Sequence, residues 1–272
     1  MTATSNSARG PAPGIKEFLI QVYGDRREEL LSYAVERGHG VEVSDFISGS
    51  LLDEGPRCKE LASWYRYRLP DVPGMVSLHG ALWDLVPSAR DSKIRTATRD
   101  RVIQCLDIAE ELGIEHVVFH LDFNALARDP SYPEEWAARQ AAFWREVVAG
   151  RSVTLLLENV REPRPDVVRA AVDKIGLESV GVCLDAAHVH LFGKLPQTEW
   201  VRDLNRRIRY LHISDNSQTG SEHLPCGQGT IDWKDLLRAL EAHGLCLPTV
   251  IEVPGVGGAE TTIEYLRGLT VG

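Results

Sequence analysis

Histidine and acidic residues recur near the carboxyl ends of successive apolar segments in this 272-residue chain. A carboxylate or an imidazole inside an apolar strand costs free energy unless it is paired with another group or binds a metal. Six such residues at the same end of successive segments therefore predict one polar site on a common rim. They are His79 in MVSLHG, His120 in HVVFHLDF, Glu158 in VTLLLEN, Asp185 in VGVCLDAAH, His212 in IRYLHISD and Glu252 in PTVIEVPG.

Four of these residues form a donor set for a divalent cation. Glu158, Asp185, His212 and Glu252 offer three carboxylates and one imidazole. Oxygen-rich sets of this kind suit Mn²⁺, Mg²⁺ or Co²⁺, and Zn²⁺ is also compatible. Pairing with basic residues is the alternative, but the four segments contain no Lys and a single Arg, Arg209. Because three carboxylates placed together repel one another without a cation, we expect the four residues to bind one ion.

Four histidines are candidates for a second metal or for substrate contacts. His79 and His120 could complete a second metal site in which Glu158 is the bridging carboxylate, or they could bind substrate hydroxyls. A histidine satisfied within the core is the alternative for either of them. His188, directly after the sixth apolar segment, and His223, in the loop after the seventh, could contact substrate or a third ion. An exposed loop histidine is the alternative for His223.

Strand and helix patterns alternate along the chain, and this alternation is what could bring these residues to one rim. Eight units suffice for a closed parallel barrel, and the near-continuous apolar strands fit a sheet buried on both faces. We therefore predict an α/β fold, a single (β/α)8 TIM barrel with its site at the C-terminal face. The expected strands are 15–23, 41–47, one containing His79, one ending at Asp122, 153–159, 180–185, 208–213 and 249–253, and the expected helices are 27–37, 58–67, 92–112, 133–148, 165–176, 198–207, 233–243 and 259–269.

Composition is that of one barrel-sized domain, with 43% apolar residues. Residues 1–13, rich in Ser, Ala, Pro and Gly, are predicted to be a disordered tail, and residues 14–272 to be the barrel. No apolar stretch has the length needed to cross a bilayer. The five cysteines are scattered and form no Cys-x-x-Cys pair, which favours a cytoplasmic location. The net charge of −9 provides no general attraction for nucleic acid.

Five segments resemble, in order, motifs of the xylose isomerase-like barrel superfamily. They are LLLENV, GVCLDAAHVHLFG, RYLHISDN, EHLPCGQGTIDW and VIEVPG, and the resemblance extends from 76 to 254. That superfamily contains sugar isomerases and epimerases, related dehydratases and the abasic-site endonucleases. By similarity to the ketose epimerases, Glu158, Asp185, His212 and Glu252 would bind one metal. Glu158 and Glu252 would also face opposite sides of the substrate as an acid/base pair.

The resemblance implies a divalent-metal-dependent isomerase or epimerase that acts on a sugar or sugar-like hydroxy-carbonyl substrate. A cation that chelates a carbonyl and its neighbouring hydroxyl acidifies the carbon-bound proton, so that proton transfer can proceed through a metal-bound enediolate. His188 would orient a substrate oxygen. Trp83 and Trp64 would stack on the sugar, with core packing as the alternative for both. We expect one ion, with two or three left open, and a homodimer is also left open.

Other functions stay open beside this one. The abasic-site endonucleases bind three zinc ions, and eight residues of this chain fall at matching motif positions. Ser221-Glu222-His223 departs from their pattern, in which an aspartate closely precedes the histidine, and the acidic composition disfavours DNA. A dehydratase or lyase could use the same enediolate chemistry, and a sugar- or metal-binding protein without activity is disfavoured because both glutamates are present. The eight residues are His79, His120, Glu158, Asp185, His188, His212, His223 and Glu252.

Overall fold

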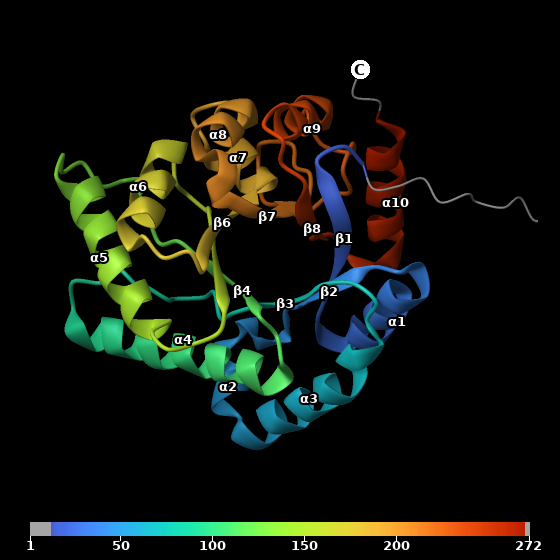
Figure 1. Ribbon diagram of the computed structural model, residues 1–272, viewed down its shortest axis with the longest axis horizontal. Coiled ribbons are helices and arrows are strands. Elements are labelled where there is room, and N and C mark those ends of the chain that lie inside the picture. The colour runs from blue at the N-terminus through green and yellow to red at the C-terminus, as the bar shows by residue number, and fades with distance from the viewer. Residues whose placement is uncertain (1–11, 270–272) are drawn as a thin grey trace, which may run out of the picture.

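Eight parallel strands form a closed barrel in the computed structural model, which describes residues 12–269 (Figure 1). Each strand pairs with the next along the chain, and β1 pairs with β8 to close the sheet. The strands are β1 (Ile15–Val22), β2 (Gly40–Val43), β3 (Val76–His79), β4 (His116–His120), β5 (Thr154–Glu158), β6 (Val180–Asp185), β7 (Ile208–Ile213) and β8 (Leu247–Ile251).

Helices between the strands form an outer ring around the barrel (Figure 1). Helices α1, α4 and α6 end at Gly38, Gly113 and Gly176, each in the left-handed conformation that glycine adopts without strain. The predicted single (β/α)8 barrel is therefore confirmed. The α-helices are α1 (Arg27–Arg37), α2 (Gly49–Asp53), α3 (Gly55–Arg68), α4 (Ser92–Leu112), α5 (Tyr132–Val147), α6 (Pro165–Ile175), α7 (Ala186–Phe192), α8 (Gln197–Leu204), α9 (Trp233–Ala242) and α10 (Gly255–Gly268), and the short 3-10 turns are η1 (Gly24–Arg26), η2 (Asp45–Ile47), η3 (Leu69–Asp71) and η4 (Asn205–Arg207).

Several strands end before the predicted residue, among them the second and the fourth. The second ends at Val43 rather than at residue 47, because Asp45 turns away to accept a hydrogen bond from Gly24 N (2.7 Å) and to pair with Arg27 Nε (2.8 Å). The fourth ends at His120 rather than at residue 122. The end of β4 therefore coincides with a candidate ligand.

Helix α7, which follows β6 without a loop, is absent from the prediction. Asp185 starts it by accepting a hydrogen bond from the backbone N–H of His188 at 2.7 Å. A carboxylate at this position caps a helix and favours its first turn. One side chain thus both ends a strand and starts a helix.

The barrel interior has an apolar layer below a polar one. One buried cluster consists of Leu19, Val118, Leu156, Cys183, Tyr210 and Val250, each from a different strand. Because residues from six strands of a closed barrel can contact one another only inside it, this cluster fills the barrel interior. Side chains on one face of a strand recur every two residues, so the next inward position lies two residues closer to the carboxyl end. Those positions hold Gln21, His120, Glu158, Asp185, His212 and Glu252.

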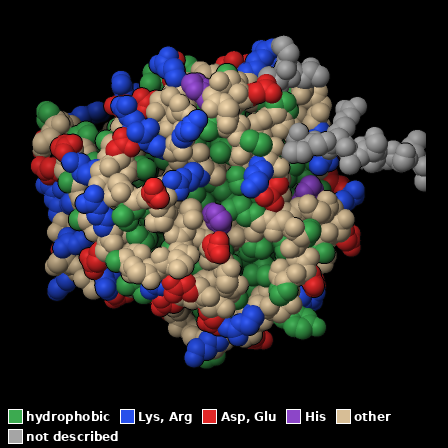
Figure 2. Space-filling view, viewed as in Figure 1, with side chains coloured by type: hydrophobic (Ala, Val, Ile, Leu, Met, Phe, Trp, Pro, Cys, Tyr) green, Lys and Arg blue, Asp and Glu red, His purple; other side chains and the backbone are tan. Residues whose placement is uncertain are grey.

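Acidic and basic side chains are interspersed over the face shown in Figure 2. Several acidic and basic side chains of the chain form ion pairs; Arg151, in the loop after α5, pairs with Asp107 at 2.7 Å and with Glu110 at 2.9 Å, both on α4. Exposed pairs of this kind contribute little stability individually.

The amino-terminal tail predicted over residues 1–13 lies outside the described residues except for its last two. Ala12 is buried against the core, and its carbonyl accepts a hydrogen bond from Ile15 N at 3.0 Å. Between residues 12 and 269, no helix combines the length and the hydropathy of a membrane-spanning segment.

Candidate metal centre

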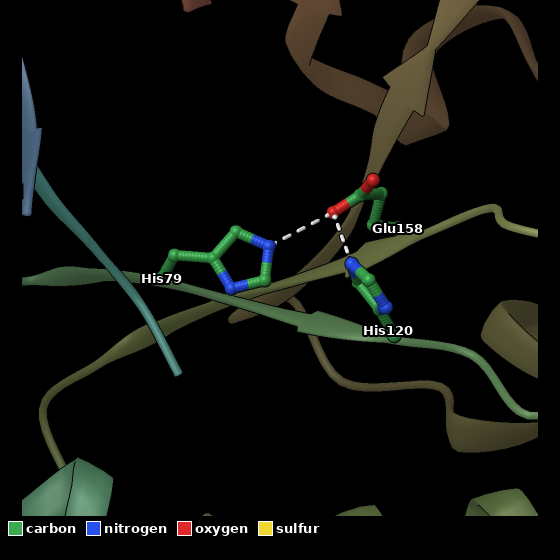
Figure 3. Close-up of side chains that lie close together, drawn as sticks. All are labelled: His79, His120 and Glu158. Atoms are coloured by element: carbon green, nitrogen blue, oxygen red, sulfur yellow. Dashed lines mark hydrogen bonds and ion pairs between the residues drawn. The ribbon is translucent and has the colours of Figure 1, made fainter. Parts of the chain in front are cut away.

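Glu158, at the end of β5, lies at the centre of the site and has imidazoles near both carboxylate oxygens. His79 Nε2 and His120 Nε2 lie 3.2 and 3.3 Å from its Oε2 atom (Figure 3). His188 Nδ1 lies 3.2 Å from its Oε1 atom. The side chain of Glu158 is 1% exposed. This carboxylate is therefore placed to bridge separate groups of nitrogen donors.

His212, on β7, adds a fourth imidazole. Its Nδ1 lies 3.5 Å from Glu158 Oε2 and 3.3 Å from Glu252 Oε1. Among the described residues, this buried nitrogen has no hydrogen-bond partner. A buried polar atom without a partner costs free energy. A divalent cation between this nitrogen and the two carboxylates would satisfy all three groups, so the residues fit a metal ion.

Asp185 joins the cluster through His188. Its Oδ2 lies 3.3 Å from His188 Nδ1, while Oδ1 caps α7. Asn159 holds the backbone here, because its side-chain oxygen accepts a hydrogen bond from Asp185 N (2.9 Å) and its amide donates to Asp185 O (3.1 Å). The capped start of α7 thus brings His188 close to Glu158.

Backbone carbonyls orient three of the histidines. Fixing one ring nitrogen in this way sets the direction of the other, as is usual for metal-binding histidines. The contacts are His79 Nδ1 to Gly80 O (2.9 Å), His223 Nδ1 to Glu252 O (2.9 Å) and His188 Nδ1 to Asn159 O (3.0 Å). In His188, the fixed nitrogen is the same one that lies near Glu158 and Asp185.

The buried charges at the site shift one another's pKa values. Burial alone would raise the pKa of Glu158, but His120 and His212 outweigh it and hold that pKa well below its usual range. Burial raises the pKa of Glu252. Burial opposes the charged form of His188, yet Asp185 and Glu158 raise its pKa to about 10. Protons on imidazoles thus balance buried carboxylates, a role that a bound cation can take over.

Four overlapping triads of donor atoms within the described chain could each hold an ion, and three of them include Glu158. Within each triad the donor atoms lie within 4.8 Å of one another. The structure therefore brings the four predicted ligands into a continuous cluster with His79, His120 and His188. The triads are His79–His120–Glu158, His79–His212–Glu252, Glu158–Cys183–His212 and Glu158–Asp185–His188.

The remaining predicted contacts lie outside these triads. His223 lies beside the backbone of Glu252, and its Nε2 is 3.2 Å from Ser221 Oγ. Trp83 is 70% exposed on the loop after β3. Trp64 packs edge-on against Tyr65 and against the main core, which is the packing alternative given for it above.

Two residues at the site were not identified from the sequence. Glu42 Oε2 lies 3.2 Å from His212 Nε2, and Gln21 Nε2 donates a hydrogen bond to Glu252 Oε1 at 2.9 Å. An acid between Val41 and Val43 in an apolar strand is the same signal that identified the candidate ligands, so Glu42 could have been found from the sequence. Gln21 had no comparable signal, because its segment, IKEFLIQV, carries other polar residues.

The fold and the cluster define a β/α barrel with a candidate metal centre at the carboxyl ends of its strands. The chain belongs to the xylose isomerase-like TIM barrel family, whose profile matches residues 52–269. A Mycobacterium leprae protein named probable endonuclease 4 is 27% identical over 199 residues, which cover 68% of this chain and 75% of that protein. An uncharacterised Methanocaldococcus jannaschii protein is 23% identical over 71% of this chain and 69% of its own length.

Solved structures share the whole barrel. A Thermus thermophilus protein, solved after soaking with ZnCl2, is 28% identical with a TM-score of 0.74, and the match covers 92% of this chain and 96% of that one. A D-tagatose 3-epimerase-like protein is 21% identical with a TM-score of 0.70 over the same shares, which supports the fold alone. The substrate, the number of ions, the homodimer and the cytoplasmic location remain predictions.

Proposed function

We propose that this protein is a divalent-metal-dependent enzyme that moves a proton on a sugar-like hydroxy-carbonyl substrate, as an isomerase or epimerase. One observation carries the proposal: Glu158 of β5 and Glu252, directly after β8, converge on Nδ1 of His212, which has no hydrogen-bond partner within residues 12–269. This arrangement supplies a cation site with a carboxylate on either side. Removal and return of a carbon-bound proton require groups of this kind within reach of the substrate.

His212, Glu158 and Glu252 would hold the catalytic ion, with Asp185 next to them. Such an ion polarises a carbonyl and stabilises the negative charge that develops when the neighbouring carbon loses its proton. His79 and His120 lie near the same Oε2 atom of Glu158 that His212 faces. They would hold a second ion or bind substrate hydroxyls.

Glu252 is better placed than Glu158 to carry the proton. Its side chain is slightly more exposed than that of Glu158, at 7% against 1%. Gln21 holds its Oε1 atom at 2.9 Å and thereby fixes the direction of the carboxylate. Glu158 has imidazoles near both oxygens. We therefore assign proton transfer chiefly to Glu252 and cation binding chiefly to Glu158.

Exchange of solvent deuterium into substrate tests this assignment. In D2O with saturating Mn²⁺ and a panel of ketoses, the wild-type protein should incorporate deuterium next to the carbonyl. Glu252→Gln should lower the exchange rate by roughly 10²- to 10⁴-fold, the usual contribution of a general acid or base. Glu264→Gln, an exposed position on α10, is the control and should match the wild type. Undiminished exchange in Glu252→Gln would remove this residue from the role.

Phosphodiester hydrolysis is a second candidate, supported by His79 and His120. Their Nε2 atoms flank one oxygen of Glu158, so two ions could share this carboxylate. Paired ions stabilise both the attacking and the leaving oxygen in such reactions. The Mycobacterium leprae relative is named probable endonuclease 4. Nicking of a duplex with an abasic site, without deuterium exchange on any ketose, would favour this candidate over the first.

A further inference from the structure

Glu42, on β2, places another buried carboxylate on the opposite side of the His212 ring. Both side chains are 0% exposed, and Glu42 Oε2 lies 3.2 Å from His212 Nε2. The other ring nitrogen, Nδ1, faces Glu158 and Glu252. The imidazole of His212 therefore lies between the Glu42 carboxylate on one side and the Glu158 and Glu252 carboxylates of the candidate metal centre on the other.

Hydroxyl groups hold Glu42 in place on one side only. Ser77 Oγ donates a hydrogen bond to Glu42 Oε2 at 3.3 Å, and Tyr210 OH lies 2.6 Å from the same Ser77 oxygen. Glu42 Oε1 is buried and has no hydrogen-bond partner among the described residues. A buried carboxylate satisfied at one oxygen is costly, and an apolar side chain would fill the barrel without this cost. Folding alone therefore does not account for Glu42.

We infer that Glu42 is a positioning residue that keeps a proton on His212 Nε2 and thereby directs the Nδ1 lone pair toward a divalent cation. This inference rests on the proposed function, because it takes His212 as a ligand. A carboxylate on the outer N–H of a metal-binding imidazole fixes the ring and its tautomer and strengthens it as a donor. Loss of such a partner weakens metal binding by about 10- to 100-fold.

Cd²⁺ binding to the full-length protein tests the inference through two measurements. Calorimetry gives the affinity, and NMR coupling between cadmium and isotope-labelled imidazole nitrogens shows which nitrogen binds. In the wild type, we expect coupling to His212 Nδ1 and a proton on Nε2. Glu42→Leu should bind Cd²⁺ about 10- to 100-fold more weakly. The amide oxygen of Glu42→Gln can accept the same N–H hydrogen bond without a negative charge, so the Cd²⁺ affinity of this variant should lie between those of the wild type and Glu42→Leu. If Glu42→Leu does not fold, Glu42→Gln provides the test.

Asp45→Asn is the matched control, because Asp45 is also a buried acid next to β2. Asp45 pairs with Arg27 and accepts a hydrogen bond from Tyr65 OH (2.6 Å), and neither residue belongs to the candidate metal centre. This variant should lose thermal stability and keep the Cd²⁺ affinity and the Nδ1 coupling of the wild type. Equal losses of affinity in Asp45→Asn and Glu42→Leu, or unchanged affinity in Glu42→Leu, would overturn the role of Glu42. A wild-type protein that bound no Cd²⁺ would overturn the metal centre itself, and the proposed function with it.

Discussion

Surroundings shift the pKa of Glu158 and that of Glu252 in opposite directions, although both are buried glutamates at the same rim. Each oxygen of Glu158 faces an imidazole nitrogen at 3.2–3.5 Å. Burial alone would raise the pKa of this carboxyl, but His120 and His212 hold it well below its usual range, whereas burial raises the pKa of Glu252. A carboxylate that stays ionised is a good cation ligand and a weak proton carrier.

Glu158→Gln should therefore act mainly on metal affinity. Because Glu158 lies within reach of donors from several strands, its loss should weaken Mn²⁺ binding by more than the roughly 10- to 100-fold that an outer hydrogen-bond partner contributes. Titration of Mn²⁺, followed by electron paramagnetic resonance of the free ion, measures this affinity directly. Mn²⁺ binding as tight as in the wild type would show that Glu158 is not a ligand.

Two acids, the half-buried Asp122 and the buried Glu162, connect the loops that border the candidate metal centre. Asp122, directly beyond β4, accepts hydrogen bonds from Ser88 N (2.9 Å) and Ser88 Oγ (2.8 Å) in the loop after β3. Glu162, in the loop after β5, accepts hydrogen bonds from Val160 N (2.7 Å) and Phe123 N (3.3 Å). The connections after β3, β4 and β5 are thereby joined, which limits how far the ends of these strands can move apart.

Glu162 should make these connections sensitive to pH. Burial raises the pKa of Glu162 from 4.5 to about 7. A carboxyl group whose pKa is higher in the folded state stabilises the fold below its unfolded pKa, and that contribution is lost as the pH rises through the folded pKa. Between those two values, the free energy of unfolding should fall more steeply for the wild type than for Glu162→Gln. Urea denaturation at several pH values measures both slopes, and parallel slopes would contradict the prediction.

The sequence was sufficient to predict the strands of the barrel because each buried strand carries its own apolar pattern. Polar residues inside those apolar patterns, such as His212, identified the carboxyl ends of the strands as the place of the candidate site. The contacts of Glu42 with His212 and of Gln21 with Glu252 join strands far apart in the sequence, and they exist only once the barrel has closed. Helix α7 was missed because a single cap at Asp185, rather than a helical period, starts it.

Closure of the barrel brings the two ends of the described chain together. Helix α10 lies beside α1 (Figure 1), and Arg37 Nη2 pairs with Glu260 Oε1 at 3.0 Å. His39, between α1 and β2, is buried at this junction, with its ring centroid 6.2 Å from that of Phe18 and 6.0 Å from that of Tyr33. The first and last helices thus cover a titratable side chain.

His39 should make the whole fold less stable in acid. Burial, together with the nearby Arg267 and Arg37, lowers the pKa of His39 from 6.5 to about 4. The neutral imidazole therefore favours the folded state above its unfolded pKa, and this contribution is lost as the pH falls toward the folded value. Across that range, the wild type should lose more free energy of unfolding than His39→Gln, as measured by denaturant titration. An equal loss in both proteins would mean that His39 does not set the acid sensitivity.

The apolar cluster that includes Leu19, Leu156 and Val250 lies two residues below the polar rim. Thermal stability therefore depends on one layer of side chains, and the donor atoms of the candidate site belong to another. Shortening Leu156 or Val250 would open a void and lower the melting temperature, whereas changing His79 or Glu252 alters donor chemistry one level higher and leaves that hydrocarbon packing intact. An engineer could therefore exchange the candidate ligands at the rim for other donor side chains while the apolar layer below them keeps the barrel folded.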